Sequence, residues 1–234
     1  MIDNDMHESD SLIGISSKNT RLGFIRKVYL IVLFLITIVA GFVIMACYWE
    51  AYRDFLVNNP WVAIVAFVVQ IWTGYGIVCY KSIAREVPKN YIYLTFYATS
   101  IAVIVSFVGL IHTRAEIATA AGLTFLLVGS LTIYALTTKT DFTFCGAFLF
   151  SFLCLTIVCG VGLAFWPKRI VSIGLSWVTL VLFSVYLIMD TQLIVGGKEY
   201  QYSSDDYIVA ALQLFIDIVK IFLEILKIFA QASR

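Results

Sequence analysis

Residues 91–136 read YIYLTFYATSIAVIVSFVGLIHTRAEIATAAGLTFLLVGSLTIYAL, and this stretch decides the fold class. Two apolar runs, Tyr91–Ile111 and Ile117–Leu136, are separated by the five residues from His112 to Glu116. Each run has about the 20 residues that an α-helix needs to cross the hydrocarbon core of a bilayer. Because lipid offers no hydrogen-bond partners, the backbone groups of each run must pair within it, which predicts helices. The short polar connection then makes the two helices antiparallel neighbours in a membrane.

The rest of the chain repeats this pattern. Of 234 residues, 61% are hydrophobic and 13% are charged, whereas about 25% are charged in a typical soluble domain. We therefore predict an all-α integral membrane protein, with one transmembrane helical bundle over residues 21–234 and a disordered cytosolic tail over residues 1–20. Seven transmembrane helices are expected, one for each apolar run: Val28–Tyr48, Trp61–Tyr80, Tyr91–Ile111, Ile117–Leu136, Phe142–Trp166, Ile170–Val195 and Tyr207–Phe229.

The connections between the runs carry Lys and Arg residues unequally on the two sides of the membrane. Positively charged connections stay preferentially in the cytosol. Nine Lys and Arg residues lie on the side of the N-terminus and four on the opposite side, which predicts a cytosolic N-terminus. The N-terminal side has Lys18, Arg21, Arg26, Lys27, Lys81, Arg85, Lys89, Lys139 and Lys198, and the opposite side has Arg53, Arg114, Lys168 and Arg169.

The seventh run differs from the others because it contains regularly spaced polar residues. At about 100° per residue, these residues form one stripe roughly 80° wide on a helix, and neighbouring charges within it can pair locally. Two interpretations remain open: an amphipathic helix that lies flat on the membrane, or a central spanning helix whose stripe faces a cavity. The polar stripe consists of Gln213, Asp217, Lys220, Glu224, Lys227 and Gln231.

Asp190 lies near the end of the very apolar sixth run. It is either a helix-end carboxylate that reaches water or a buried functional acid. Because the sixth and seventh runs are consecutive, Asp190 and Asp217 could meet. Two carboxylates at short range do not easily both carry charge, so such a pair binds a proton or a cation as one unit. Carboxylate oxygens are also preferred ligands of Ca²⁺, which makes Asp190 and Asp217 the candidate calcium ligands.

Three sequence stretches resemble a known family. Residues 189–223 read MDTQLIVGGKEYQYSSDDYIVAALQLFIDIVKIFL, residues 24–29 read FIRKVY, and residues 134–142 read YALTTKTDF. These stretches resemble the transmembrane Bax inhibitor motif family, in its lifeguard or Golgi anti-apoptotic protein branch. The resemblance extends from about Arg21 to Phe229. The chain departs from the usual pattern at Ser204–Asp206, where Pro-Glu-Glu is typical, and at Lys220, where Asn is typical.

The resemblance implies a seven-helix bundle around the last helix. It also implies a calcium leak from intracellular stores, regulated by pH through Asp190 and Asp217, and suppression of apoptosis. A basic residue at the end of the second span would pair with the first acid in the closed state, and Arg85 is the best match. The expected location is the Golgi or endoplasmic reticulum membrane. The expected partners are lipid, calcium ions and membrane proteins of cell-death or calcium signalling.

Other function classes fit the residues less well. Two membrane aspartates also describe an intramembrane aspartyl protease, but no Gly-x-Gly-Asp pattern precedes either acid, so an enzyme is not expected. A non-conducting scaffold that modulates cell death through protein partners remains the main alternative. A net charge of +1 does not indicate nucleic acid binding. With two His and five Cys but no C-x-x-C, neither a zinc nor a redox site is expected. No cofactor is predicted besides calcium as a permeant or bound ion.

Overall fold

A computed structural model describes residues 2–165, 169–197 and 200–232, with the backbone alone for residues 2–18, 81, 164, 165 and 232. Every regular element within these ranges is helical, which confirms the predicted all-α fold. The elements are α1 (Ile2–Tyr48), α2 (Glu50–Asn58), α3 (Trp61–Cys79), α4 (Lys81–Arg85), α5 (Lys89–Leu110), α6 (Arg114–Thr137), the 3₁₀ turn η1 (Thr143–Cys145), α7 (Gly146–Phe165), α8 (Arg169–Val195) and α9 (Tyr207–Ala232).

Six of these helices are long and apolar enough to cross a membrane: Asn19–Tyr48 within α1, then α3, α5, α6, Thr143–Leu163 and α8. They correspond to the first six predicted spans. The seventh, α9, has 26 residues, but its interior contains Asp217, Lys220, Glu224 and Lys227. Each such charge costs a few kcal/mol at the centre of a bilayer, so composition and length alone do not identify α9 as a span.

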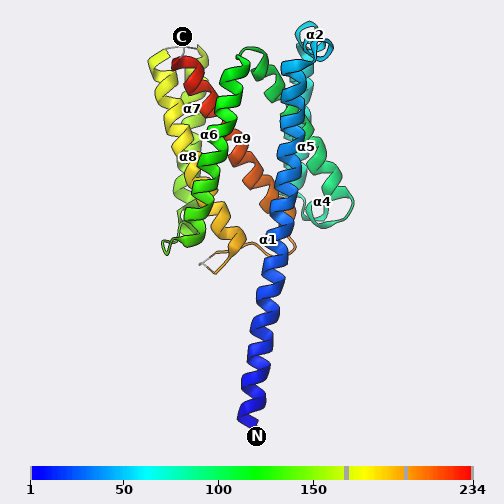
Figure 1. Ribbon diagram of the computed structural model, residues 1–234, viewed down its shortest axis with the longest axis vertical. Coiled ribbons are helices and arrows are strands. Elements are labelled where there is room, and N and C mark those ends of the chain that lie inside the picture. Colours follow the sequence, from blue (N-terminus) through cyan, green and yellow to red (C-terminus); the bar gives the residue numbers. More distant parts are fainter. Residues whose placement is uncertain (1, 166–168, 198–199, 233–234) are drawn as a thin grey trace.

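The N-terminal part of α1 extends beyond the bundle (Figure 1). The helix begins at Ile2, within the segment for which the sequence predicts a disordered tail. The division into a tail and a bundle stays a prediction. Trp166, Pro167, Lys168 and Lys198, for which the sequence predicts a span end, a connection and loop charges, lie outside the described residues.

Local chemistry explains where several helices begin and end. Thr113 accepts a hydrogen bond from the backbone N–H of Glu116, and the Glu116 side chain accepts one from the backbone N–H of Thr113, so that a capping box starts α6. At the end of α1, Arg53 donates to the carbonyls of Ala46 and Cys47. The short helices α2 and α4 lie in connections for which the sequence predicts only polar loops.

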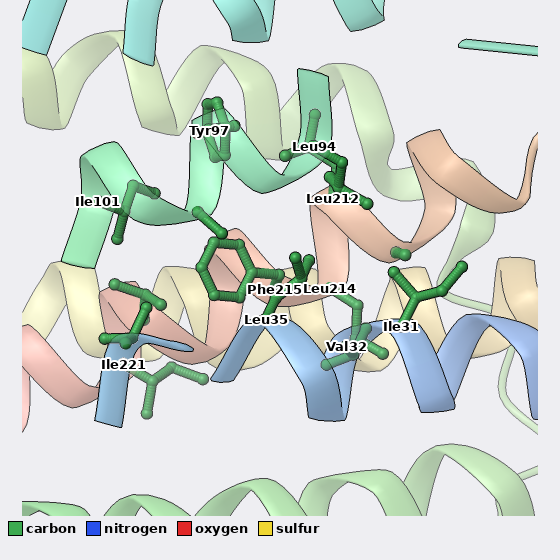
Figure 2. Close-up of a cluster of buried hydrophobic side chains, with 14 of the residues drawn as sticks. Ile31, Val32, Leu35, Leu94, Tyr97, Ile101, Leu212, Leu214, Phe215 and Ile221 are labelled. Atoms are coloured by element: carbon green, nitrogen blue, oxygen red, sulfur yellow. The ribbon is translucent and has the colours of Figure 1, made fainter. Parts of the chain in front are cut away.

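The bundle is arranged around α9. Figure 1 shows α1 and α5 on one side, α6, α7 and α8 on the other, and α9 running obliquely between them from the lower end to the end where the C-terminus lies. The most extensive contacts of α9 are with α8, followed by α6 and α1. The hydrophobic core joins α1, α5 and α9 (Figure 2), with Leu35, Leu94 and Phe215 at its centre. Large apolar side chains such as Phe125 and Phe148 instead cover the outer surface, as expected for helices in contact with lipid.

Candidate carboxylate pair between α8 and α9

Asp190 of α8 and Asp217 of α9 lie side by side in the interior of the bundle. Their exposed fractions are 3% and 4%, and the two carboxyl groups are within hydrogen-bonding reach of each other. Asp190 follows a stretch of α8 that is apolar except for single hydroxyl residues, and Asp217 follows the apolar first turns of α9. The tight packing of α8 on α9 brings the two acids together. The expectation that these two carboxylates meet is therefore consistent with the structure.

The chemistry of this contact depends on one proton. A carboxylate has no hydrogen to donate, so two ionised groups cannot hydrogen-bond to each other. Accordingly, Asp190 Oδ1 and Asp217 Oδ2 are buried and receive no hydrogen bond from any group that the structure describes. Leaving buried carboxylate oxygens unsatisfied is costly. A single proton shared between the groups, or a cation bound by both, would satisfy them.

Hydroxyl groups surround the pair. Tyr186 of α8 and Tyr202, in the connection to α9, lie close enough to Asp190 and Asp217 to interact with them electrostatically. Burial, and then the charge of Asp190 and of Asp217, raise the pKa of Tyr202, so that its hydroxyl keeps its proton and remains a donor. Thr191 is buried next to Asp190, with the hydroxyl of Tyr29 beside it. The pair thus has oxygen-containing side chains as its neighbours.

Arg21 of α1 anchors the end of α8 near the pair. Its guanidinium donates to the carbonyls of Leu193 at 2.6 Å, Tyr202 at 2.7 Å and Val195 at 3.1 Å. The carbonyls of Leu193 and Val195 lie in the last turn of α8, which ends at Val195, so they have no partner further along the helix. Gly196 follows in the left-handed region at φ 76°, and a Cβ there would lie 2.9 Å from Arg21 Nη2. A glycine is therefore required both by the turn and by the arginine.

Gln192, two residues after Asp190, anchors the connection between α6 and α7. Its side-chain amide donates to the carbonyl of Thr140 at 2.9 Å and accepts from the backbone N–H of Phe142 at 2.9 Å. The side chain is buried. One end of α8 is thus fixed to two other parts of the chain, which gives Asp190 a defined position.

Arg85 does not contact Asp190 in the structure, contrary to the expectation for a closing cation. It pairs with Asp206, the residue before α9, with Nη2–Oδ1 and Nε–Oδ1 distances of 2.8 Å and 3.1 Å. The physical reason is location, because Arg85 lies on the exposed helix α4 and Asp190 is enclosed by other helices. The same end of α9 is held by Asn90, which donates to the hydroxyl of Tyr207 at 2.9 Å.

The polar stripe of α9 divides into two parts. Asp217 and Glu224 are buried, whereas Gln213, Lys220 and Lys227 are exposed. Of the local ion pairs expected along the stripe, Glu224 with Lys227 forms at 2.7 Å. Those of Lys220 with Asp217 and with Glu224 do not form in the part of the chain that the structure describes. Positions 213, 220 and 227 are seven residues apart and share one exposed edge of the stripe, roughly 40° to 80° around the helix from Asp217.

Sequence reasoning missed the roles of Arg21, Gln192 and Tyr202. Arg21 counted only toward membrane orientation, and Gln192 only as part of the Asp-Thr-Gln motif. Partners 50 or more residues away in the sequence determine what both residues do. No cluster of three or more His, Cys, Asp or Glu residues exists among the described residues, so calcium would depend on the two aspartates together with other oxygens.

The chain is similar in sequence to known proteins. Residues 21–234 match the model of the family described as inhibitor of apoptosis-promoting Bax1. The chain is similar to protein lifeguard 3 of Mus musculus, with 29% identity over 208 residues (86% of this chain, 67% of the relative), and to protein lifeguard 3 of Homo sapiens, with 26% over 206 residues (86% and 66%). Similarity to protein LIFEGUARD 4 of Arabidopsis thaliana is 30% over 210 residues (88% and 83%). The chain thus spans about two thirds of the length of the two mammalian relatives.

Proposed function

Because the chain belongs to the family of inhibitors of apoptosis-promoting Bax1 over residues 21–234, we propose that it is a pH-sensitive calcium leak channel of an intracellular membrane that suppresses apoptosis. The observation that carries the proposal is the contact between the buried carboxyls of Asp190 and Asp217. The contact joins α8, which carries Asp190, to α9, which carries Asp217.

One proton would determine the state of the pair. While a proton is shared, the hydrogen bond ties α8 to α9 and closes the path. When the pH rises and the proton leaves, two like charges face each other in the interior. At about 4 Å and an effective dielectric constant of about 20, their repulsion is roughly 4 kcal/mol. Separating the helices or binding Ca²⁺ relieves this repulsion, so calcium flux should increase with pH.

The path itself would follow α9, which we propose as the seventh span. Its polar stripe supplies oxygens at Asp217 and Glu224 along the bundle axis, and the helix runs between the two ends of the bundle (Figure 1). Lys220 and Lys227 point to the exposed face, so they repel a passing cation less than their spacing alone would imply. Glu224 is already neutralised by Lys227 at 2.7 Å, which leaves the aspartate pair as the control point.

The remaining parts of the proposal follow from the family. A calcium leak from the Golgi or endoplasmic reticulum lowers the calcium load of the store, which connects the channel to cell-death signalling. Membrane proteins of calcium or cell-death signalling would be its partners.

The test is calcium flux into proteoliposomes that contain this protein alone, measured as a function of pH for wild type, Asp190→Asn and Asp217→Asn. Asn keeps the size and the hydrogen-bonding capacity of Asp but does not ionise, so both variants should fold and their flux should lose its pH dependence. The matched control is Asp205→Asn, an identical change at an exposed loop position, which should preserve the wild-type profile.

Two results would overturn the proposal in different ways. No flux above that of empty liposomes at any pH would favour the non-conducting scaffold. A flux that is unaltered in both variants would leave the leak intact but assign the aspartates a structural role.

A further inference from the structure

A second feature lies on the other side of α9 from the carboxylate pair. A groove with a cavity volume of about 530 Å³ opens between α1 and α6 and has α9 as its floor. Val43 of α1, Ala121 and Gly129 of α6, and Phe222 of α9 are among its lining residues. On the helix, Phe222 is about 140° away from Asp217. The groove is therefore separate from the proposed ion path.

The groove runs along the membrane normal. It begins at Tyr48 and Arg114, at one end of α1 and α6, and reaches Val128 and Gly129. The 15 residue steps from Arg114 to Gly129 correspond to roughly 22 Å of helix. One leaflet occupies about half of the roughly 30 Å hydrocarbon core. The groove is thus long enough for an acyl chain of one leaflet.

Small side chains keep the groove open. α6 packs mainly on α8 and α9, and α1 mainly on α5 and α9, so the two helices flank α9 without closing over it. On the α6 wall, Ala118, Ala121 and Gly129 leave space. A Cβ added at Gly129 would meet no atom within 4 Å. Water gains no hydrogen bonds in an apolar groove of this kind, and the medium beside these two spans is hydrocarbon, so a lipid chain is the natural occupant.

A cation lies at the mouth of the groove. The guanidinium of Arg114 lies 4.7 Å from the centroid of the Tyr48 ring, and the side chain is exposed. No carboxylate among the described residues is within ion-pair distance of Arg114, and the nearby Glu116 is held in the capping box of α6. Arg binds phosphate through two parallel hydrogen bonds, and Tyr is typical of the interface where phosphates lie.

We propose that this groove binds a phospholipid, with one acyl chain between α1 and α6 and the phosphate on Arg114. The apolar length of the groove and the exposed cation at its interfacial end match the two parts of such a lipid. An anionic headgroup adds a favourable charge interaction. The bound chain would lie against the face of α9 that carries Ile218, Val219 and Phe222.

The experiment uses the full chain in vesicles of phosphatidylcholine with a minor fraction of phosphatidylglycerol that carries a photoactivatable group on one acyl chain. After irradiation, mass spectrometry identifies the labelled peptides. The variants are Gly129→Leu, which fills the groove, and Arg114→Gln, which removes the charge. Gly162→Leu is the matched control, because it makes the same change on α7, where an added Cβ also meets open space.

In the wild type, labelling should concentrate on residues 117–129 of α6 and 36–48 of α1. Gly129→Leu should reduce it to the level of other lipid-facing helices, and Gly162→Leu should leave it unchanged. Arg114→Gln should weaken the preference for phosphatidylglycerol over phosphatidylcholine about fivefold, the factor that corresponds to about 1 kcal/mol per surface cation.

Uniform labelling of all lipid-facing helices in the wild type would overturn the proposal, because the groove would then hold only bulk lipid. So would labelling that Gly129→Leu does not alter. To exclude a second copy as occupant, Ala121→Cys is oxidised in the vesicles. A disulfide-linked dimer at high yield would assign the groove to self-association instead.

Discussion

The guanidinium of Arg85 on α4 lies 2.8 Å from Asp206 Oδ1, at the entrance to α9. This ion pair connects the segment between α3 and α5 to the start of α9, and not to the buried Asp190. The hydrogen bond and the charge of Asp206 raise the pKa of Arg85 above its usual value, so the pair loses its cation only at pH values above the physiological range. Arg85 can therefore restrain α9 throughout the working range of the protein.

The first prediction concerns this restraint. Arg85→Ala and Asp206→Ala should change calcium flux in proteoliposomes by similar amounts, and the double variant should add nothing, because both remove the same pair. The effect should diminish at high salt, since both side chains are partly exposed. Lys89→Ala, which breaks the neighbouring exposed pair with Glu86, is the control and should have no effect. Additive changes would indicate that Arg85 acts on another acid.

The second prediction concerns the end of α8. Gly196→Ala should reduce the free energy of unfolding by about 3 kcal/mol, from about 1 kcal/mol for the left-handed backbone and the rest for the displaced side chain of Gln201 and the disturbed hydrogen bonds of Arg21. Gly197→Ala should lose only the roughly 1 kcal/mol for the left-handed backbone. Gly197 has a similar φ of 79°, but no atom lies within 4 Å of a Cβ added there. Denaturant unfolding in detergent compares the two. Equal losses would mean that the position of Arg21 does not matter.

The third prediction concerns Gln192. Gln192→Ala should destabilise the protein by about 2 kcal/mol, because it removes both hydrogen bonds of a buried side-chain amide, at about 1 kcal/mol each. Gln213→Ala removes the same side chain from an exposed position of α9 and should change stability little. Thermal unfolding in detergent measures both variants. A difference close to zero would contradict the role of Gln192 as an anchor.

The fourth prediction concerns the exposed face of α9. In a background without the five native cysteines, three of which are exposed, Cys at positions 213, 220 and 227 should react with a charged thiol reagent. Cys at 212 and 215 should not, because Leu212 and Phe215 are buried in the core. Cys at 217 should also be slow, since Asp217 is buried. Equal rates around the helix would contradict the packing of α9.

The fifth prediction concerns topology. If α9 is a seventh span, the N-terminus and the C-terminus lie on opposite sides of the membrane, as at the two ends of the bundle in Figure 1. In sealed vesicles, protease should remove a tag from one terminus and leave a tag at the other intact. Detergent should expose both. Digestion of both tags in sealed vesicles would instead place α9 in the membrane interface.

Arg85 and Lys220 illustrate where reasoning from the sequence fails. The family resemblance implied a pair of Arg85 with Asp190, whereas helical spacing indicated pairs of Lys220 with Asp217 or Glu224. The described residues form none of these pairs. Arg85 pairs with an acid 121 residues away. Lys220 is directed outward because neighbouring helices occupy the side of α9 that holds Asp217. Spacing along a helix defines the angle between two side chains around its axis. The neighbouring helices decide which sides of that helix are covered by protein and which stay exposed.

From the sequence alone we could predict the all-α membrane fold, the approximate positions of the first six spans and Asp190 and Asp217 as candidate acids. Apolar runs of about 20 residues can satisfy their backbone in lipid only as helices, so these features depend on the local sequence alone. The tertiary structure decided that Asp190 and Asp217 touch, that Arg21 and Gln192 hold the end of α8, and that a groove remains between α1 and α6. Each of these depends on which helix packs against which, and side-chain shapes from distant segments determine that packing.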